Sequence, residues 1–359
     1  MTYIKMPNSA NAIARPPEDT SLFLAGMACV AGDQVKTVAD AVLEGSYSQQ
    51  QAEKDGYTSL RHSEATVPEM AMFVSKSALQ IAEVDGESLG LISFTSIHDH
   101  GHARLWQPSA YIQNQLSAQY ALAWNLSFGC NGFALGVLQA ALLLPGLSGP
   151  ALIVGADRFD GTGFDRWTSD QGLAYGDAAS AVVLSAESGF AEVTYLNVEY
   201  ATELEALHRL DQVTYPSGNA AWNITASKRG FINQYGGKAF FDVLNAALDR
   251  LEANVISYLR ETGTTLDAVV TPFVGMSVRA TTYDARFHRL AAANASAFGA
   301  TIGHTGTSDQ LLGLAHLIDN KSVKPGGYVL MIGAGAGFSL SAMVVRLNTP
   351  ATFPLLGEI

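Results

Sequence analysis

Cys130 has the surroundings that best suit covalent chemistry in this chain. It stands in the segment NLSFGCNG, where a strand-like stretch meets an apolar helix expected over 133–144. A thiol at a helix N-terminus is favoured in its reactive thiolate form by the helix dipole. Gly129 and Gly132 permit a sharp turn and leave room for a substrate. These features predict a nucleophile, and the structural alternative is a small buried hydrophobic residue.

His304 and Asp309, in the segment GHTGTSD, are the residues that would activate this thiol. An imidazole can accept the thiol proton, and a carboxylate can hold the imidazole in the required tautomer. The spacing brings the two side chains together only if His304 lies in a loop and Asp309 begins the helix expected over 309–319. The alternatives are a loop histidine with satisfied hydrogen bonds and, for Asp309, a helix N-cap.

A third polar cluster is the segment IHDHGHARLW, which contains His98, His100, His102 and Trp106. Alternate histidines on an extended segment point to one side, as a metal site requires. No carboxylate or cysteine partner can be matched to them. We therefore predict a loop that lines the substrate pocket with His98, His100 and Trp106, and no metal.

Composition narrows the class of protein. The 359 residues are 48% hydrophobic and 15% charged, with 34 glycines, which favours an α/β protein with a large buried sheet. A net charge of −12 without basic runs argues against nucleic acid as a partner. Of the two cysteines, Cys29 lies in an apolar strand and is expected in the core. Residues 1–17 do not read as a signal peptide and the apolar runs are short, so we expect a cytoplasmic protein without membrane contact.

Hydrophobic patterning predicts two similar blocks of alternating strands and helices. Small residues precede a β-branched run at 176–184 and again at 335–345. This repeat indicates a duplicated α/β unit with halves at 1–188 and 189–359. Strands are expected at 21–30, 89–95, 151–156, 180–185, 193–200, 268–272, 328–334 and 339–347, and helices at 34–44, 67–81, 111–119, 133–144, 238–262 and 309–319.

Five blocks, in order along the chain, carry a resemblance to the ketoacyl synthase III family of the thiolase superfamily. They are the segment around Cys130, ALIVGAD at 151–157, GDAASAVVL at 176–184, GKAFFD at 237–242 and GAGAGFS at 333–339. The resemblance implies a thiolase fold, in which duplicated α/β halves form five layers in the order α-β-α-β-α, and a homodimer.

The chain departs from the condensing members of that family, which use Cys, His and Asn. Phe273 stands where their histidine would be, and His304 where their asparagine would be. Phenylalanine cannot donate a hydrogen bond, and decarboxylative condensation needs polar groups to hold its enolate. The pattern resembles a divergent Cys-His-Asp branch of secondary metabolism, whose members transfer acyl groups to oxygen, nitrogen or carrier thiols in natural-product biosynthesis.

The resemblance implies a role for each site residue. Cys130, His304 and Asp309 would be catalytic, Phe273 would line the pocket, and backbone N–H groups of Cys130, Ala336 and Gly337 would form the oxyanion hole. The donor would be a coenzyme A or acyl carrier protein thioester, with a small-molecule acceptor and no cofactor. Gln171 replaces an arginine with which relatives grip coenzyme A, and the weak candidates for carrier-protein docking are Arg158, Arg166, Lys228 and Arg229.

Two further functions stay open. One is a decarboxylating β-ketoacyl synthase III, in which His304 replaces both polar groups. The other is a non-catalytic subunit of a heterodimeric synthase, against which the retention of Cys130 and His304 argues.

Overall fold

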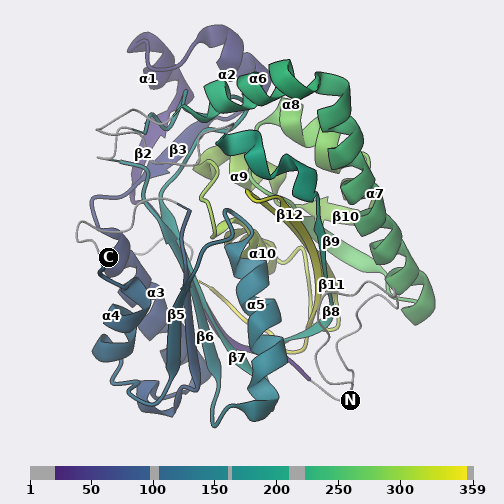
Figure 1. Ribbon diagram of the computed structural model, residues 1–359. Helices are drawn as coiled ribbons and strands as arrows, with labels where there is room; N and C mark the ends of the chain where they lie inside the picture. The colour runs from purple at the N-terminus through teal and green to yellow at the C-terminus, as the bar shows by residue number, and fades with distance from the viewer. Residues whose placement is uncertain (1–20, 98–104, 161–163, 210–222, 354–359) are drawn as a thin grey trace.

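The computed structural model describes residues 21–97, 105–160, 164–209 and 223–353 (Figure 1). The strands are β1 Phe23–Ala31, β2 Gln34–Thr37, β3 Ser59–His62, β4 Leu91–Thr95, β5 Leu122–Leu126, β6 Ala151–Asp157, β7 Ala178–Ser185, β8 Ala191–Tyr200, β9 Leu266–Val270, β10 Ala291–Asn294, β11 Tyr328–Gly335 and β12 Ser339–Leu347. The α-helices are α1 Val38–Leu43, α2 Gln49–Asp55, α3 Val67–Ala82, α4 Pro108–Gln115, α5 Gly132–Leu143, α6 Ile224–Tyr235, α7 Gly237–Thr262, α8 Met276–Arg279, α9 Ser296–Ile302 and α10 Asp309–Asp319.

Ten of the strands form two groups with the same topology. The first group has the order β5-β4-β6-β7-β1, and the second has the order β10-β9-β11-β12-β8. In each group the first three strands are parallel and the last two join antiparallel. Only two residue pairs, Phe23 with Glu192 and Leu24 with Ala191, join the groups through β1 and β8. The expected boundary between the halves falls in the turn from β7 to β8.

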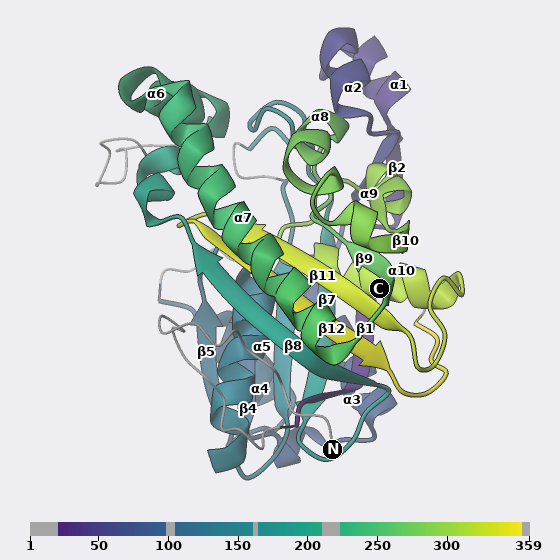
Figure 2. The same cartoon turned by 90° about the vertical axis from the view of Figure 1, so that its right-hand side faces the viewer.

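The helices make three layers around the two groups of strands. One core cluster packs α5 and α10 between both groups. A second packs α3 and α4 on the outer face of the first group, and a third packs α7 on the outer face of the second. Figure 1 shows α3 and α4 on one side and α7 on the other, and Figure 2 shows α7 crossing β8, β11 and β12. The predicted α/β thiolase fold is confirmed, although the ten strands make one continuous ladder rather than two separate sheets.

The central position of α5 explains its composition. Nine of its residues are buried, and it is apolar on every side because a sheet covers each face. Residues 129–146 are long and apolar enough to cross a membrane by composition, which the expectation of short apolar runs overlooked. Because this stretch packs inside the protein core, its apolar character is explained without a membrane.

The prediction of a helix over 34–44 was wrong at its start. Residues 34–37 form β2, which pairs with β3, and α1 begins only at Val38. Thr37 caps that helix by accepting a hydrogen bond from Asp40 N, so the chain changes from strand to helix at this residue. Similarly, α4 starts at Pro108, earlier than expected, because proline suits the first helical turn.

Candidate active site

Cys130 lies in a tightly packed turn between β5 and α5. Gly129 has a φ of +54°, and a Cβ added there would stand 2.5 Å from the backbone nitrogen of Ala336. A Cβ at Gly132 would stand 1.8 Å from Thr95 Oγ1. Both glycines are therefore required for close approach, as predicted from the sequence. Cys130 itself is partly exposed, whereas Cys29 is buried in β1 as expected, and burial raises the pKa of its thiol.

Asn131, which follows Cys130, anchors this turn to the other half of the molecule. Its Nδ2 donates to Ser339 Oγ at 3.1 Å, and its Oδ1 accepts from Ser341 Oγ at 2.7 Å. Asn131 is fully buried, so these hydrogen bonds satisfy an amide that would otherwise be costly to bury. Strand β12 therefore fixes where the sulfur points.

His304 lies between the sulfur and a carboxylate. Its Nε2 is 3.0 Å from Cys130 Sγ, and its Nδ1 is 2.6 Å from Asp309 Oδ2. The ring is buried, and the backbone N–H of His304 donates to Ala174 O. His304 precedes α10 in a loop and Asp309 is the first residue of that helix, which is the arrangement that the sequence spacing required.

Asp309 is held by four hydrogen bonds. Oδ1 accepts from the backbone N–H and the hydroxyl of Thr305, each at 2.7 Å. Oδ2 accepts from the backbone N–H of Phe273 at 2.8 Å as well as facing His304. The N-cap of α10 is Ser308, so the capping role considered for Asp309 is not the one it has. These hydrogen bonds hold the carboxylate in a fixed orientation toward the imidazole.

The electrostatics favour a protonated His304. Burial lowers the pKa of its imidazole, but the Asp309 carboxylate and the Cys130 sulfur raise it more, so the pKa stands well above its usual value. A histidine with a raised pKa can hold the proton taken from a neighbouring thiol. The arrangement can therefore support a thiolate beside an imidazolium.

The remaining predicted site residues occupy different positions. Ala336 approaches Gly129 and is exposed together with Gly337, on the loop after β11. Phe273 packs its ring against Phe298 and lines a cavity of about 360 Å³, whose described lining includes neither Cys130 nor His304. Trp106 is half-buried, with its ring 5.8 Å from that of Tyr111. His98, His100 and His102 lie outside the described residues.

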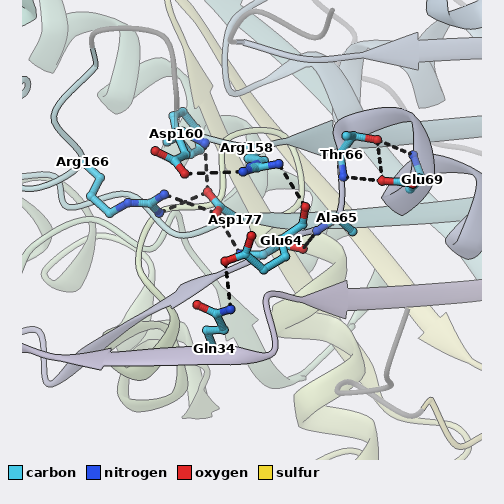
Figure 3. A network of polar contacts seen from close by, with 11 residues as sticks. Gln34, Glu64, Ala65, Thr66, Glu69, Arg158, Asp160, Arg166 and Asp177 are labelled. Carbon is cyan, nitrogen blue, oxygen red and sulfur yellow. Dashed lines mark hydrogen bonds and ion pairs between the residues drawn. The ribbon is translucent and has the colours of Figure 1, made fainter.

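The candidate residues for carrier-protein docking differ in accessibility. Arg166 is buried and donates to both oxygens of Asp177, which also accepts from the backbone N–H of Phe159 (Figure 3). The prediction that Arg166 docks a carrier protein is therefore wrong, because its guanidinium is buried and paired with Asp177. Lys228 pairs with Asp170 at 2.6 Å, and Arg229 is exposed and donates to Gln171.

The sequence prediction missed the tyrosines around the triad. The ring centroid of Tyr175 lies 5.2 Å from that of His304. Tyr283 is buried, and burial and then the charges of Cys130 and Asp309 raise the pKa of its phenol. Only the fold brings these residues together. Among the described residues, no three side chains of His, Cys, Asp or Glu form a cluster that could hold a metal.

The fold and the cysteine turn define a protein of the thiolase type, and the comparisons agree. The family model for 3-oxoacyl-[acyl-carrier-protein] synthase III matches residues 125–203, and that for its C-terminal part matches 259–347. The β-ketoacyl-[acyl-carrier-protein] synthase III of Pseudomonas aeruginosa is 26% identical over 239 residues, 63% of this chain and 67% of that protein. The chain belongs to the ketoacyl synthase III-like proteins of the thiolase superfamily.

Solved structures show the same relationship. ChlB3, described as an acyltransferase, is 29% identical with a TM-score of 0.84, over 92% of this chain and 99% of that chain. The 3-oxoacyl-[acyl-carrier-protein] synthase III of Aquifex aeolicus is 20% identical with a TM-score of 0.69, over 90% of this chain and 99% of that one. The second likeness concerns the fold alone. The family is enzymatic, and its members are transferases and synthases.

Proposed function

We propose that this protein is an acyltransferase that carries an acyl group on Cys130 Sγ. It would take the group from a coenzyme A or acyl carrier protein thioester and pass it to a hydroxyl, amine or carrier thiol in natural-product biosynthesis. The observation that supports this is the continuous hydrogen-bonded series from Cys130 Sγ through His304 to Asp309. The protein would act in the cytoplasm as a homodimer, without a cofactor.

The proposed reaction has two halves. His304 Nε2 holds the sulfur proton while the thiolate attacks the donor carbonyl carbon, and the N–H groups of Cys130 and Ala336 stabilise the oxyanion. The donor thiol leaves with the proton, which frees Nε2 to accept the proton of the acceptor. The acceptor then attacks the acyl carbon and Cys130 Sγ leaves. Asp309 stabilises the imidazolium in both halves.

Phe273 supports acyl transfer over the decarboxylating alternative. Its side chain offers no hydrogen bond to an enolate, whereas its backbone N–H donates to Asp309. Decarboxylative condensation remains a second candidate because the curated relatives are named β-ketoacyl synthases. A non-catalytic subunit is disfavoured by an intact Cys–His pair.

Mass spectrometry of the intact protein tests the proposal. Incubation with a series of acyl-coenzyme A and acyl-carrier thioesters should add one acyl mass to the wild type and none to Cys130→Ala, while Cys29→Ala should load as the wild type does. A loaded protein given a malonyl thioester should release no carbon dioxide. Failure of every donor to load would contradict the acyltransferase, and carbon dioxide release would favour the condensing enzyme.

A further inference from the structure

The ring of Tyr175 and the backbone groups of its two neighbours in the chain contact His304. The two ring centroids lie 5.2 Å apart with planes at 58°, and Tyr175 is buried. On either side of Tyr175, Ala174 O accepts from His304 N at 2.8 Å, and Gly176 N donates to His304 O at 3.0 Å. A cation over the face of an aromatic ring, within about 6 Å of its centroid, is stabilised electrostatically. The separation of 5.2 Å between the two rings is within this range.

The phenol of Tyr175 is held by a buried carboxylate. Its hydroxyl donates to Asp170 Oδ2 at 3.1 Å, and Lys228 Nζ donates to Asp170 Oδ1 at 2.6 Å. Asp170 is 4% exposed, so its charge is compensated by these two donors rather than by solvent. Burial, then the charge of Asp170, then that of Cys130 raise the pKa of Tyr175 well above its usual value, so the hydroxyl remains a donor.

Helix α6 holds the loop that carries Asp170. Thr225 N donates to Ser169 O at 3.0 Å, and Gln171 N donates to Thr225 Oγ1 at 2.7 Å. Lys228 belongs to the same helix, and the buried carboxylate of Asp170 therefore links α6 to Tyr175.

We propose that Tyr175 is a positioning residue for His304, held by the Asp170–Lys228 pair, whose ring supports the imidazolium and sets its direction toward Cys130. The inference rests on the proposed function for the role of His304. The charged and titratable groups that face His304 are Asp309 from α10, Cys130 from the turn before α5 and Tyr175 from the loop before β7. Besides burial, the charge of Asp309 raises the pKa of Tyr57 and of Tyr283, and the charge of Cys130 also raises the pKa of Tyr283.

Alkylation of Cys130 by iodoacetamide, followed from pH 5 to 9 by peptide mass spectrometry, tests this without an acyl donor. Tyr175→Leu removes the ring, lowers the pKa of His304 and should slow alkylation at pH 7 about tenfold, with the rate profile moved to higher pH. Tyr175→Phe retains the ring but loses the hydroxyl, and should slow alkylation about threefold. A folded Tyr175→Leu protein with the wild-type rate and profile would overturn the proposal.

Tyr47 provides the matched control, because its hydroxyl also donates to a buried carboxylate, Asp55, at 2.5 Å. Tyr47→Phe should leave the alkylation profile unchanged, and an equal loss in this variant would overturn a specific role for Tyr175. Asp170→Asn should slow alkylation in the parent but add little to Tyr175→Phe, since Asp170 acts through the missing hydroxyl. Equal losses in both backgrounds would contradict the link. If no acyl donor loads while alkylation still depends on Tyr175, the proposed function fails and the positioning role stands.

Discussion

The two halves of the molecule each begin a central helix at the active site, but the two turns differ in exposure. The turn before α5 carries a partly exposed sulfur, close to the exposed loop that contains Ala336. The turn before α10 carries His304 and Asp309, which are buried and fully hydrogen-bonded. In the proposed reaction, the two turns thus separate the group that meets the substrate from the groups that keep a fixed geometry and charge.

Removal of the His304 imidazole should have the largest effect on the acylation of Cys130. His304→Ala should slow acylation of Cys130 about a thousandfold, because no neighbouring group then accepts the thiol proton. Single-turnover loading with the best acyl donor measures this rate. His316→Ala, in the same helix region but packed on Phe298, is the control and should load normally. If His304→Ala loaded at the wild-type rate, the turn before α10 would have no chemical role.

Asp309→Asn should give the next largest effect. The amide keeps the size of the side chain but loses the charge that stabilises the imidazolium, so loading should slow about a hundredfold. Its pH profile should also move to higher pH, because the pKa of His304 falls without Asp309. Asp319→Asn, which changes the other end of α10, should load at the wild-type rate. If Asp319→Asn loaded as slowly as Asp309→Asn, the effect would come from the stability of the helix and not from the imidazolium.

Crowding in the cysteine turn should affect stability rather than proton transfer. Gly132→Ala would place a methyl group 1.8 Å from Thr95 Oγ1, which we expect to lower the free energy of unfolding by about 1–3 kcal/mol. Chemical denaturation measures this change. Gly146→Ala, where the added methyl would have no neighbour within 4 Å, should be neutral. Equal stability of the two variants would show that the cysteine turn adapts more easily than its packing indicates.

The last comparison sets His304 beside a second, partly buried histidine, His208. Burial and then Lys228 lower the pKa of His208 to about 4, although Asp170 opposes this. Between the unfolded pKa near 6.5 and about 4, the unfolded chain binds the extra proton, so stability should fall as the pH falls through this window. For His304 the sign is opposite, and its contribution is lost as the pH rises through its raised pKa.

Denaturation of wild type and His208→Gln between pH 4 and 8 checks the acid limb. The variant should lose less stability than the wild type on acidification, by on the order of 1–3 kcal/mol. Parallel curves for the two proteins would show that His208 does not set the acid limit.

Much of the fold was accessible from local patterns. The segments at 151–156, 309–319 and 339–347 carry strong apolar patterns, and each forms the expected element at nearly the expected bounds. The edge strand β10 was missed, because a short strand at a sheet edge carries little hydrophobic alternation. Strand β5 was indicated only as a strand-like stretch before Cys130, without bounds. The helix expected over 34–44 was misassigned at its start, since pairing with β3 overrode local propensity.

The sequence alone determined which atoms could react: a thiol between two glycines, a histidine five residues before an aspartate, and a phenylalanine that removes one polar group. Chemistry of this kind depends on residue type and short spacing, both of which are local. The tertiary structure decided that His304 contacts Cys130, 174 residues away in the chain. It also decided that Tyr175, beside His304, and Lys228 both donate to Asp170. Such contacts join segments far apart in the chain, and only the pairing of the two halves around α5 and α10 brings them within hydrogen-bond distance.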